Sequence, residues 1–229
     1  MQKKGLIMNR MNLIVMLTCN DYTIPNAIEV FESARHAPAQ YWGAKEEGIS
    51  RQELKKLFAA IRESGKSPVL EVVAYSEEEG IAGAKLAIEC GCDILLGTGY
   101  FNSVNELCRA HNIRYMPFVG KVSGRPSILN GTAEAMLAEA EVYKARGVYG
   151  VDLLGYRYAG DCSALCGAVI PSAALPVCLA GSINSTAQLD EVRRLHPRFF
   201  TIGSAFLEHR FGEKIADQVA FVCSYMNHQ

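Results

Sequence analysis

Short apolar runs alternate with longer amphipathic segments along the whole chain. Residues 13–18, LIVMLT, are continuously apolar and are followed by Cys19, Asn20 and Asp21. This is the pattern of a buried parallel strand that ends at a polar rim. Seven further runs have a similar character, although the second is short. The eight predicted strands are residues 13–18, 41–45, 69–74, 93–97, 114–119 and 148–154, and two more within residues 175–208.

A helical segment follows each predicted strand. Ser50 and Glu53, for example, form a capping box ahead of apolar positions 54, 57, 58 and 61. Eight strand–helix units in succession predict a single (β/α)₈ TIM barrel over residues 1–229. A doubly wound open sheet is the alternative architecture. The repeat of about 25–30 residues per unit over the full length favours the closed barrel.

The composition and net charge of the chain limit the kinds of molecule that we expect it to bind. The chain has 229 residues, of which 49% are hydrophobic. Its net charge is −1, and its sequence contains no run of basic residues. We therefore expect one domain, no nucleic acid or membrane partner, and a small ligand. Barrels of this size often form homo-oligomers, but the sequence identifies no interface.

The eight cysteines are scattered through mostly apolar surroundings, without zinc-like spacing. The first residues are too short for a signal peptide, and no apolar run approaches the ~18 residues that span a bilayer. We therefore expect a cytoplasmic protein with reduced cysteines. We also expect residues 1–10 to be a frayed extension.

Two small-residue turns follow the last two predicted strands. The first contains Gly181 and Ser182, and the second contains Gly203 and Ser204. Glycine lets backbone N–H groups approach a ligand, serine adds a hydroxyl, and the helix that follows directs its positive end at the same place. Paired turns at this position predict a phosphate site, and they resemble those of the phosphate-binding barrels: the histidine and tryptophan biosynthesis barrels, the ribulose-phosphate-binding group and the phosphogluconate-type aldolases.

Catalytic groups in such barrels lie at the carboxyl ends of the strands. Lys45 ends the second strand, where it could form a Schiff base or stabilise an enolate as a cation. Glu71 lies within the apolar run of residues 69–73, where a charge needs a partner, such as Lys45, or a raised pKa. That run resembles the Val-Leu-Glu-Val strand of the phosphogluconate-type aldolases, and the resemblance implies that Glu71 is the acid–base group.

Other strand ends supply further candidates. Asp152 could be a second acid–base group facing Glu71 or Lys45, or a structural carboxylate. Lys121 lies just beyond the fifth strand, without the aldolases' surrounding pattern for their Schiff-base lysine. The remaining predicted substrate-binding residues are Thr98, whose glycine-flanked turn is similar to one in those aldolases, and Arg125 and Arg157, which could clamp an anion.

These residues predict an enzyme that acts on a small phosphorylated sugar or keto acid, as an aldolase-type carbon–carbon lyase. A sugar-phosphate epimerase or isomerase is one alternative, and a non-catalytic phosphometabolite-binding protein is another. No cofactor is expected. A metal-assisted lyase stays open because the rim is rich in carboxylates, including Asp21, Glu71 and Asp152. Asp21 could instead cap the helix that follows it.

Overall fold

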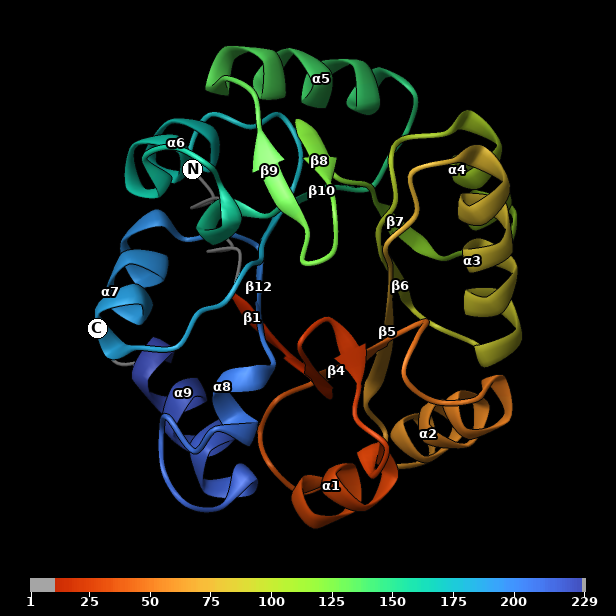
Figure 1. Cartoon of the computed structure of the whole chain (residues 1–229), viewed down its shortest axis with the longest axis vertical. Coiled ribbons are helices and arrows are strands. Elements are labelled where there is room, and N and C mark those ends of the chain that lie inside the picture. The colour runs from red at the N-terminus through yellow and green to blue at the C-terminus, as the bar shows by residue number, and fades with distance from the viewer. Residues whose placement is uncertain (1–10, 228–229) are drawn as a thin grey trace, which may run out of the picture.

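Eight parallel strands form a closed barrel inside a ring of helices (Figure 1). The computed structural model describes residues 11–227, so the predicted frayed extension at residues 1–10 lies outside the described residues. The predicted (β/α)₈ TIM barrel is confirmed. In sheet order the strands are β10 (Val151–Leu153), β11 (Val177–Leu179), β12 (Phe199–Ile202), β1 (Asn12–Met16), β4 (Tyr41–Lys45), β5 (Ser67–Val72), β6 (Ile94–Gly97) and β7 (Arg114–Met116).

The barrel closes between β7 and β10. Asp152 donates its backbone N–H to the carbonyl oxygen of Pro117 at 2.8 Å, and Val119 donates to the carbonyl oxygen of Asp152 at 3.2 Å. Strand β7 ends at Met116, three residues before the predicted limit, and Pro117 has no N–H to donate to a ladder. The pairing resumes as a parallel bridge between Phe118 and Asp152.

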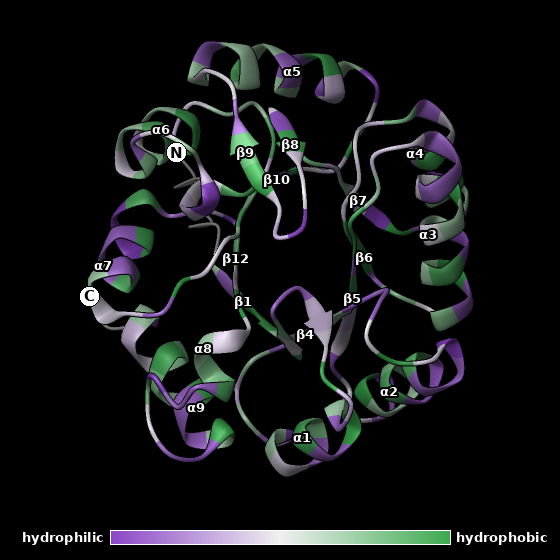
Figure 2. Ribbon diagram, in the orientation of Figure 1, coloured by the Kyte–Doolittle hydropathy of each residue, from purple (hydrophilic) through white to green (hydrophobic). Residues whose placement is uncertain are grey.

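Helices connect the strands and cover the outside of the barrel. The predicted capping box of Ser50 and Glu53 is present, and Ser76 and Glu79 form a second one. Figure 2 shows hydrophobic and hydrophilic residues on the same helices, as expected for helices with one face on the barrel and one in solvent. The helices are α1 (Ala27–Ala34), α2 (Arg51–Glu63), α3 (Glu77–Cys90), α4 (Asn102–Ala110), α5 (Ala133–Ala145), α6 (Cys162–Val169), α7 (Thr186–Leu195), α8 (Ser204–Leu207) and α9 (Ile215–Asn227), with a 3₁₀ turn η1 (Gly155–Arg157).

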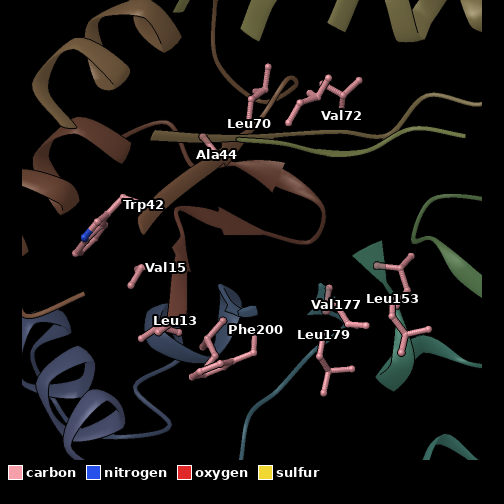
Figure 3. Packing of buried hydrophobic residues seen from close by; sticks show 14 of the residues in the cluster. Leu13, Val15, Trp42, Ala44, Leu70, Val72, Leu153, Val177, Leu179 and Phe200 are labelled. Carbon is pink, nitrogen blue, oxygen red and sulfur yellow. The ribbon is translucent and has the colours of Figure 1, made fainter. Parts of the chain in front are cut away.

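Alternation along each strand divides the core in two. In β1, Leu13 and Val15 belong to the larger cluster between strands and helices, whereas Ile14 and Met16 belong to a smaller cluster inside the barrel. Successive strand side chains point to opposite faces, so strands that are buried on both faces have continuous apolar runs. Figure 3 shows residues of the larger cluster, among them Trp42, which is fully buried.

Two short antiparallel hairpins interrupt the barrel pattern, and neither was predicted. The first, β2 (Thr18–Cys19) and β3 (Tyr22–Thr23), turns at Asn20 and Asp21, whose φ angles are +50° and +68°. The second, β8 (Lys121–Ser123) and β9 (Ile128–Asn130), occupies the predicted loop after the fifth strand. Both hairpins follow barrel strands at their carboxyl ends, where the active site of such a barrel lies.

None of the eight cysteines, which all lie within residues 11–227, forms a disulfide, and five of them are buried. Burial raises the pKa of several of these thiols, including that of Cys108 to about 12, so they stay protonated at neutral pH. Within residues 11–227, no helix is long and apolar enough to cross a membrane.

Candidate functional site

A cavity of about 640 Å³ opens at the carboxyl ends of the barrel strands. Its lining includes Lys45 and Glu71 from adjacent strands, Asp21 from the first hairpin, and Arg157 from the turn after β10. The two glycine-serine turns after β11 and β12 also line it. The cavity therefore brings together most of the residues that the strand-end rule selected.

A chain of alternating charges crosses the floor of this cavity. Nη1 of Arg157 lies 2.7 Å from Oδ2 of Asp21, and its Nη2 lies 2.8 Å from Oδ1. Nζ of Lys45 lies 2.9 Å from Oδ1 of Asp21 and 3.2 Å from Oε1 of Glu71. Lys45 and Asp21 are only 4% and 5% exposed, so these ion pairs are shielded from solvent screening.

Lys45 stays a cation in this environment. Burial by itself lowers the pKa of its ammonium group, but the negative charges of Glu71 and Asp21 outweigh burial and raise the pKa above its ordinary value. A lysine that forms a Schiff base must become a neutral amine. The surroundings of Lys45 therefore favour the second predicted role, a cation that stabilises an enolate.

Asp21 connects the two cations of the site. Burial raises the pKa of its carboxyl group, but hydrogen bonds and charges from Arg157 and Lys45 outweigh burial and hold the pKa well below its usual range. Asp21 was weighed from the sequence as a helix cap or an oxygen ligand, and its place between two cations was missed. The sequence did contain one sign of the hairpin that places Asp21 here, namely the consecutive residues Asn20 and Asp21. A two-residue hairpin turn in which both φ angles are positive favours asparagine, aspartate and glycine.

In each glycine-serine turn, neighbouring atoms leave little room for a side chain at the glycine. Gly181 has φ of +106°, and a Cβ atom there would lie 3.0 Å from Cγ of Arg157. At Gly203 a Cβ atom would lie 2.8 Å from Oγ1 of Thr18, and 3.1 Å from its carbonyl oxygen. Ser182 follows the first glycine with φ of +70°, and Ser204 is the first residue of α8. The two turns expose backbone to the cavity where larger residues would not fit.

The second hairpin covers part of the cavity. Its residues Pro126, Ser127 and Ile128 line the cavity, and the backbone N–H of Ser127 approaches Oδ2 of Asp21 at 3.4 Å. None of these residues was predicted, because no periodic signal in the loop sequence marks a two-stranded element of three residues per strand.

Three predicted residues lie elsewhere. Lys121 is exposed on β8 and does not line the cavity. The hydroxyl of Thr98 is fully buried and bonds to Tyr115 and to the carbonyl oxygen of Gly99. Arg125 binds Glu46 at 2.9 Å and Glu47 at 3.0 Å. It therefore ties the second hairpin to the loop after β4, and it does not face the cavity.

Asp152 lies inside the barrel and is fully buried. Neither of its carboxyl oxygens has a hydrogen-bond partner among the described residues, and it is absent from the cavity lining. Burial, and then the charge of Glu71, raise the pKa of this carboxyl group well above its ordinary value. The carboxyl group of Asp152 therefore interacts electrostatically with Glu71, but it does not line the cavity.

The carboxylates that could bind a metal ion at the cavity, Asp21 and Glu71, are paired with the cationic side chains of Lys45 and Arg157. Within residues 11–227, no group of three or more His, Cys, Asp or Glu side chains has an arrangement that could hold a metal ion. The ammonium group of Lys45 lies within bonding distance of both Asp21 and Glu71, in the place where an ion bridging these two carboxylates would sit. These side chains therefore fit a lysine cation better than a divalent ion.

The chain matches no family model, and it matches no curated protein sequence. Its fold is similar to that of many solved structures. A thiamine phosphate pyrophosphorylase from Pyrococcus furiosus has a TM-score of 0.66 at 15% identity, over 96% of each chain. An orotidine 5'-phosphate decarboxylase from Pyrococcus horikoshii has a TM-score of 0.70 at 11% identity, over 95% of this chain and all of the other.

A tryptophan synthase chain from M. tuberculosis is similar as well, with a TM-score of 0.69 at 15% identity over 96% of this chain and 94% of the other. The resemblance predicted from the sequence is therefore confirmed for the TIM-barrel fold alone. Because a fold hosts many activities, the function has to be argued from the site itself.

Proposed function

We propose that this protein is an enzyme that moves a proton next to the carbonyl group of a small phosphorylated sugar or keto acid, as an isomerase or epimerase does. The observation that carries the proposal is the buried ammonium group of Lys45, held 2.9 Å from Asp21 and 3.2 Å from Glu71 at the cavity. An enediolate intermediate needs a cation, a general base and an anchor for the rest of the substrate.

The residues divide these tasks. Glu71 takes the proton from the carbon next to the carbonyl, and Lys45 donates a hydrogen bond to the oxygen that becomes negative. For an aldose–ketose isomerisation, the protonated Glu71 then returns the proton to the neighbouring carbon, while the hydroxyl proton of the enediolate passes to the former carbonyl oxygen. For an epimerisation, Glu71 releases its proton to solvent, and water delivers a proton to the opposite face of the same carbon. The glycine-serine turns at residues 181–184 and 203–205 bind the phosphate through backbone N–H groups, and Arg157 stands beside the first turn.

The neighbouring structures support the phosphate anchor only by analogy. The names of two of them, thiamine phosphate pyrophosphorylase and orotidine 5'-phosphate decarboxylase, include a phosphate compound. This chain has their fold and a pair of glycine-serine turns lining the cavity at the carboxyl ends of its last two strands. A small phosphorylated substrate is the ligand that both features favour.

The experiment uses a panel of phosphorylated ketoses, aldoses and keto acids in deuterated water, with NMR detection of deuterium at carbon. We expect exchange or isomerisation of at least one compound by the wild type, and loss of both by Glu71→Gln. A borohydride treatment of the same mixtures tests the lyase alternative. An adduct on Lys45 would overturn the proposal in favour of a Schiff-base aldolase.

Two outcomes address the remaining alternatives. Binding of a phosphorylated compound without exchange or cleavage, seen as thermal stabilisation that survives Lys45→Ala, would indicate a non-catalytic binding protein. Exchange that a chelator abolishes and a divalent ion restores would favour the metal-assisted lyase or isomerase. Exchange that is insensitive to chelator supports the lysine-based site.

A further inference from the structure

Asp152 is a buried carboxyl group that the proposed reaction does not use. Its neighbours Val151 and Leu153 on β10 pack in the cluster between the strands and the helices. Because side chains alternate along a strand, the side chain of Asp152 points into the barrel. Its register partner on β11, Cys178, belongs to the cluster inside the barrel.

The hydrogen-bonding environment of Asp152 is poor. The residue is 0% exposed, and neither carboxyl oxygen has a hydrogen-bond donor among the described residues. Buried carboxylates are normally paired or hydrogen-bonded, because an isolated charge in the interior is costly. Asp21 shows the usual solution in the same protein, with hydrogen bonds from Lys45 and Arg157.

The charges of the site are already balanced without Asp152. Two cations, Lys45 and Arg157, are hydrogen-bonded or ion-paired to two carboxylates, Asp21 and Glu71. An ionised Asp152 would add a third negative charge for which this group has no cation left. The charged and titratable groups that act on Asp152 are Glu71 on β5, Lys45 on β4, Arg157 in η1 and Cys178 on β11.

We propose that Asp152 is a positioning residue that remains a neutral carboxylic acid beneath Lys45 and Glu71, and thereby leaves the charge of Lys45 available to an anionic intermediate in the cavity. Its neutrality follows from burial, the missing donors and the charge balance. An ionised carboxylate at this place would instead draw Lys45 toward the barrel interior and would disfavour a negative intermediate. The second half of the inference rests on the proposed function, whereas the first does not.

The protonation state can be measured without a substrate. Aspartate labelled with ¹³C at its side-chain carboxyl gives one NMR signal per residue, and Asp152→Asn identifies the signal of Asp152 by its loss. We expect that signal to keep the chemical shift of a protonated acid at pH 7, where exposed aspartates are ionised. A shift typical of a carboxylate at pH 7 would overturn the proposal.

A second measurement covers the case in which Asp152→Asn does not fold. The infrared spectrum of the wild type should contain the carbonyl band of a protonated acid at pH 7. This band should move when only the aspartates are ¹³C-labelled, which distinguishes a protonated aspartate from a protonated glutamate. Among the aspartates of residues 11–227, Asp152 is the buried one without a hydrogen-bond partner, whereas the buried Asp21 is paired with Lys45 and Arg157. Absence of a label-sensitive band at pH 7 would equally overturn the proposal.

The functional half has its own test, in the deuterium-exchange assay. Asp152→Asn copies the shape and neutrality of the protonated acid, so it should keep the exchange rate within about tenfold and lose any decline that Asp152 ionisation causes at high pH. If Asp152 were instead a second base that takes a substrate proton, the rate would fall by about 10²–10⁴. Failure of all substrates to exchange would count against the proposed function, while the NMR result would still decide the state of Asp152.

Discussion

Arg157 donates two hydrogen bonds to Asp21, at 2.7 and 2.8 Å, across 136 positions of sequence. Arg157 follows β10, and Asp21 follows β1, so the two strands that bear the glycine-serine turns lie between them in the barrel. The pair therefore spans the part of the rim that contains the predicted phosphate site. It also continues through Asp21 to Lys45, so that one carboxylate holds two cations of the cavity.

Asp21→Asn should destabilise the protein and change its response to acid. The pKa of Asp21 is lower in the folded than in the unfolded chain, so its stabilising contribution is fully present above the unfolded pKa of about 4 and is lost gradually as the pH falls from that value through the lower folded-state pKa. Removing one partner of a buried ion pair costs about 3–5 kcal/mol. Urea unfolding at pH 7 and pH 3 should therefore separate wild type from variant strongly at pH 7 and less at pH 3. An equal difference at both values would contradict this account.

Lys45→Met should slow the proposed reaction by about 10²–10³, while Lys121→Met should leave its rate unchanged. Removal of an electrostatic group that stabilises a developing oxyanion lowers rates by about 10²–10³. Lys121 is exposed on the second hairpin, so its replacement should alter stability by no more than about 0.5 kcal/mol. The deuterium-exchange assay, with urea unfolding as the check on folding, distinguishes the two lysines. Loss of activity in Lys121→Met alone would show that the wrong lysine has been selected.

Gly203→Ala should weaken phosphate binding. A Cβ atom would lie 2.8 Å from Oγ1 of Thr18 and 3.1 Å from the Thr18 carbonyl oxygen, so the turn must shift. Thermal unfolding with and without inorganic phosphate measures the effect. Gly167→Ala is the matched control, because nothing lies within 4 Å of its Cβ position and alanine favours the helix by about 0.5–1 kcal/mol. Phosphate stabilisation that is the same in both variants would argue against the second turn as an anion site.

Arg125→Ala should loosen the second hairpin without unfolding the barrel. Arg125 binds Glu46 and Glu47, and its Nη2 also lies 3.3 Å from the carbonyl oxygen of Val73. Partly exposed ion pairs contribute about 1 kcal/mol or less, so the global stability should change little. Hydrogen exchange of amides 121–130 should accelerate, because local opening becomes easier. Unchanged exchange in this segment would mean that other contacts hold the hairpin.

The order of apolar runs and capping signals was enough to predict the barrel. Runs such as residues 13–18 are apolar throughout because both faces of a barrel strand are buried, with Ile14 inside and Leu13 outside. The rule that active sites lie at strand ends then selected Lys45 and Glu71, which the structure brings to 3.2 Å. Their proximity was open to prediction because β4 and β5 are consecutive barrel strands that pair with Lys45 opposite Glu71.

Tertiary structure alone decided which of the other charged residues joined them. Asp21 and Arg157 meet only because β1 pairs with β12, the last strand in sequence, and the curved sheet brings the ends of β1 and β10 together across the rim. This pairing joins distant parts of the chain and does not follow from any local pattern. From the sequence, Arg125 was as plausible as Arg157, and Lys121 was a further candidate, but a hairpin directs Lys121 to the surface and Arg125 to Glu46 and Glu47. Local sequence determines strand, turn and cap, whereas burial and charge balance, as at Asp152, are properties of the assembled barrel.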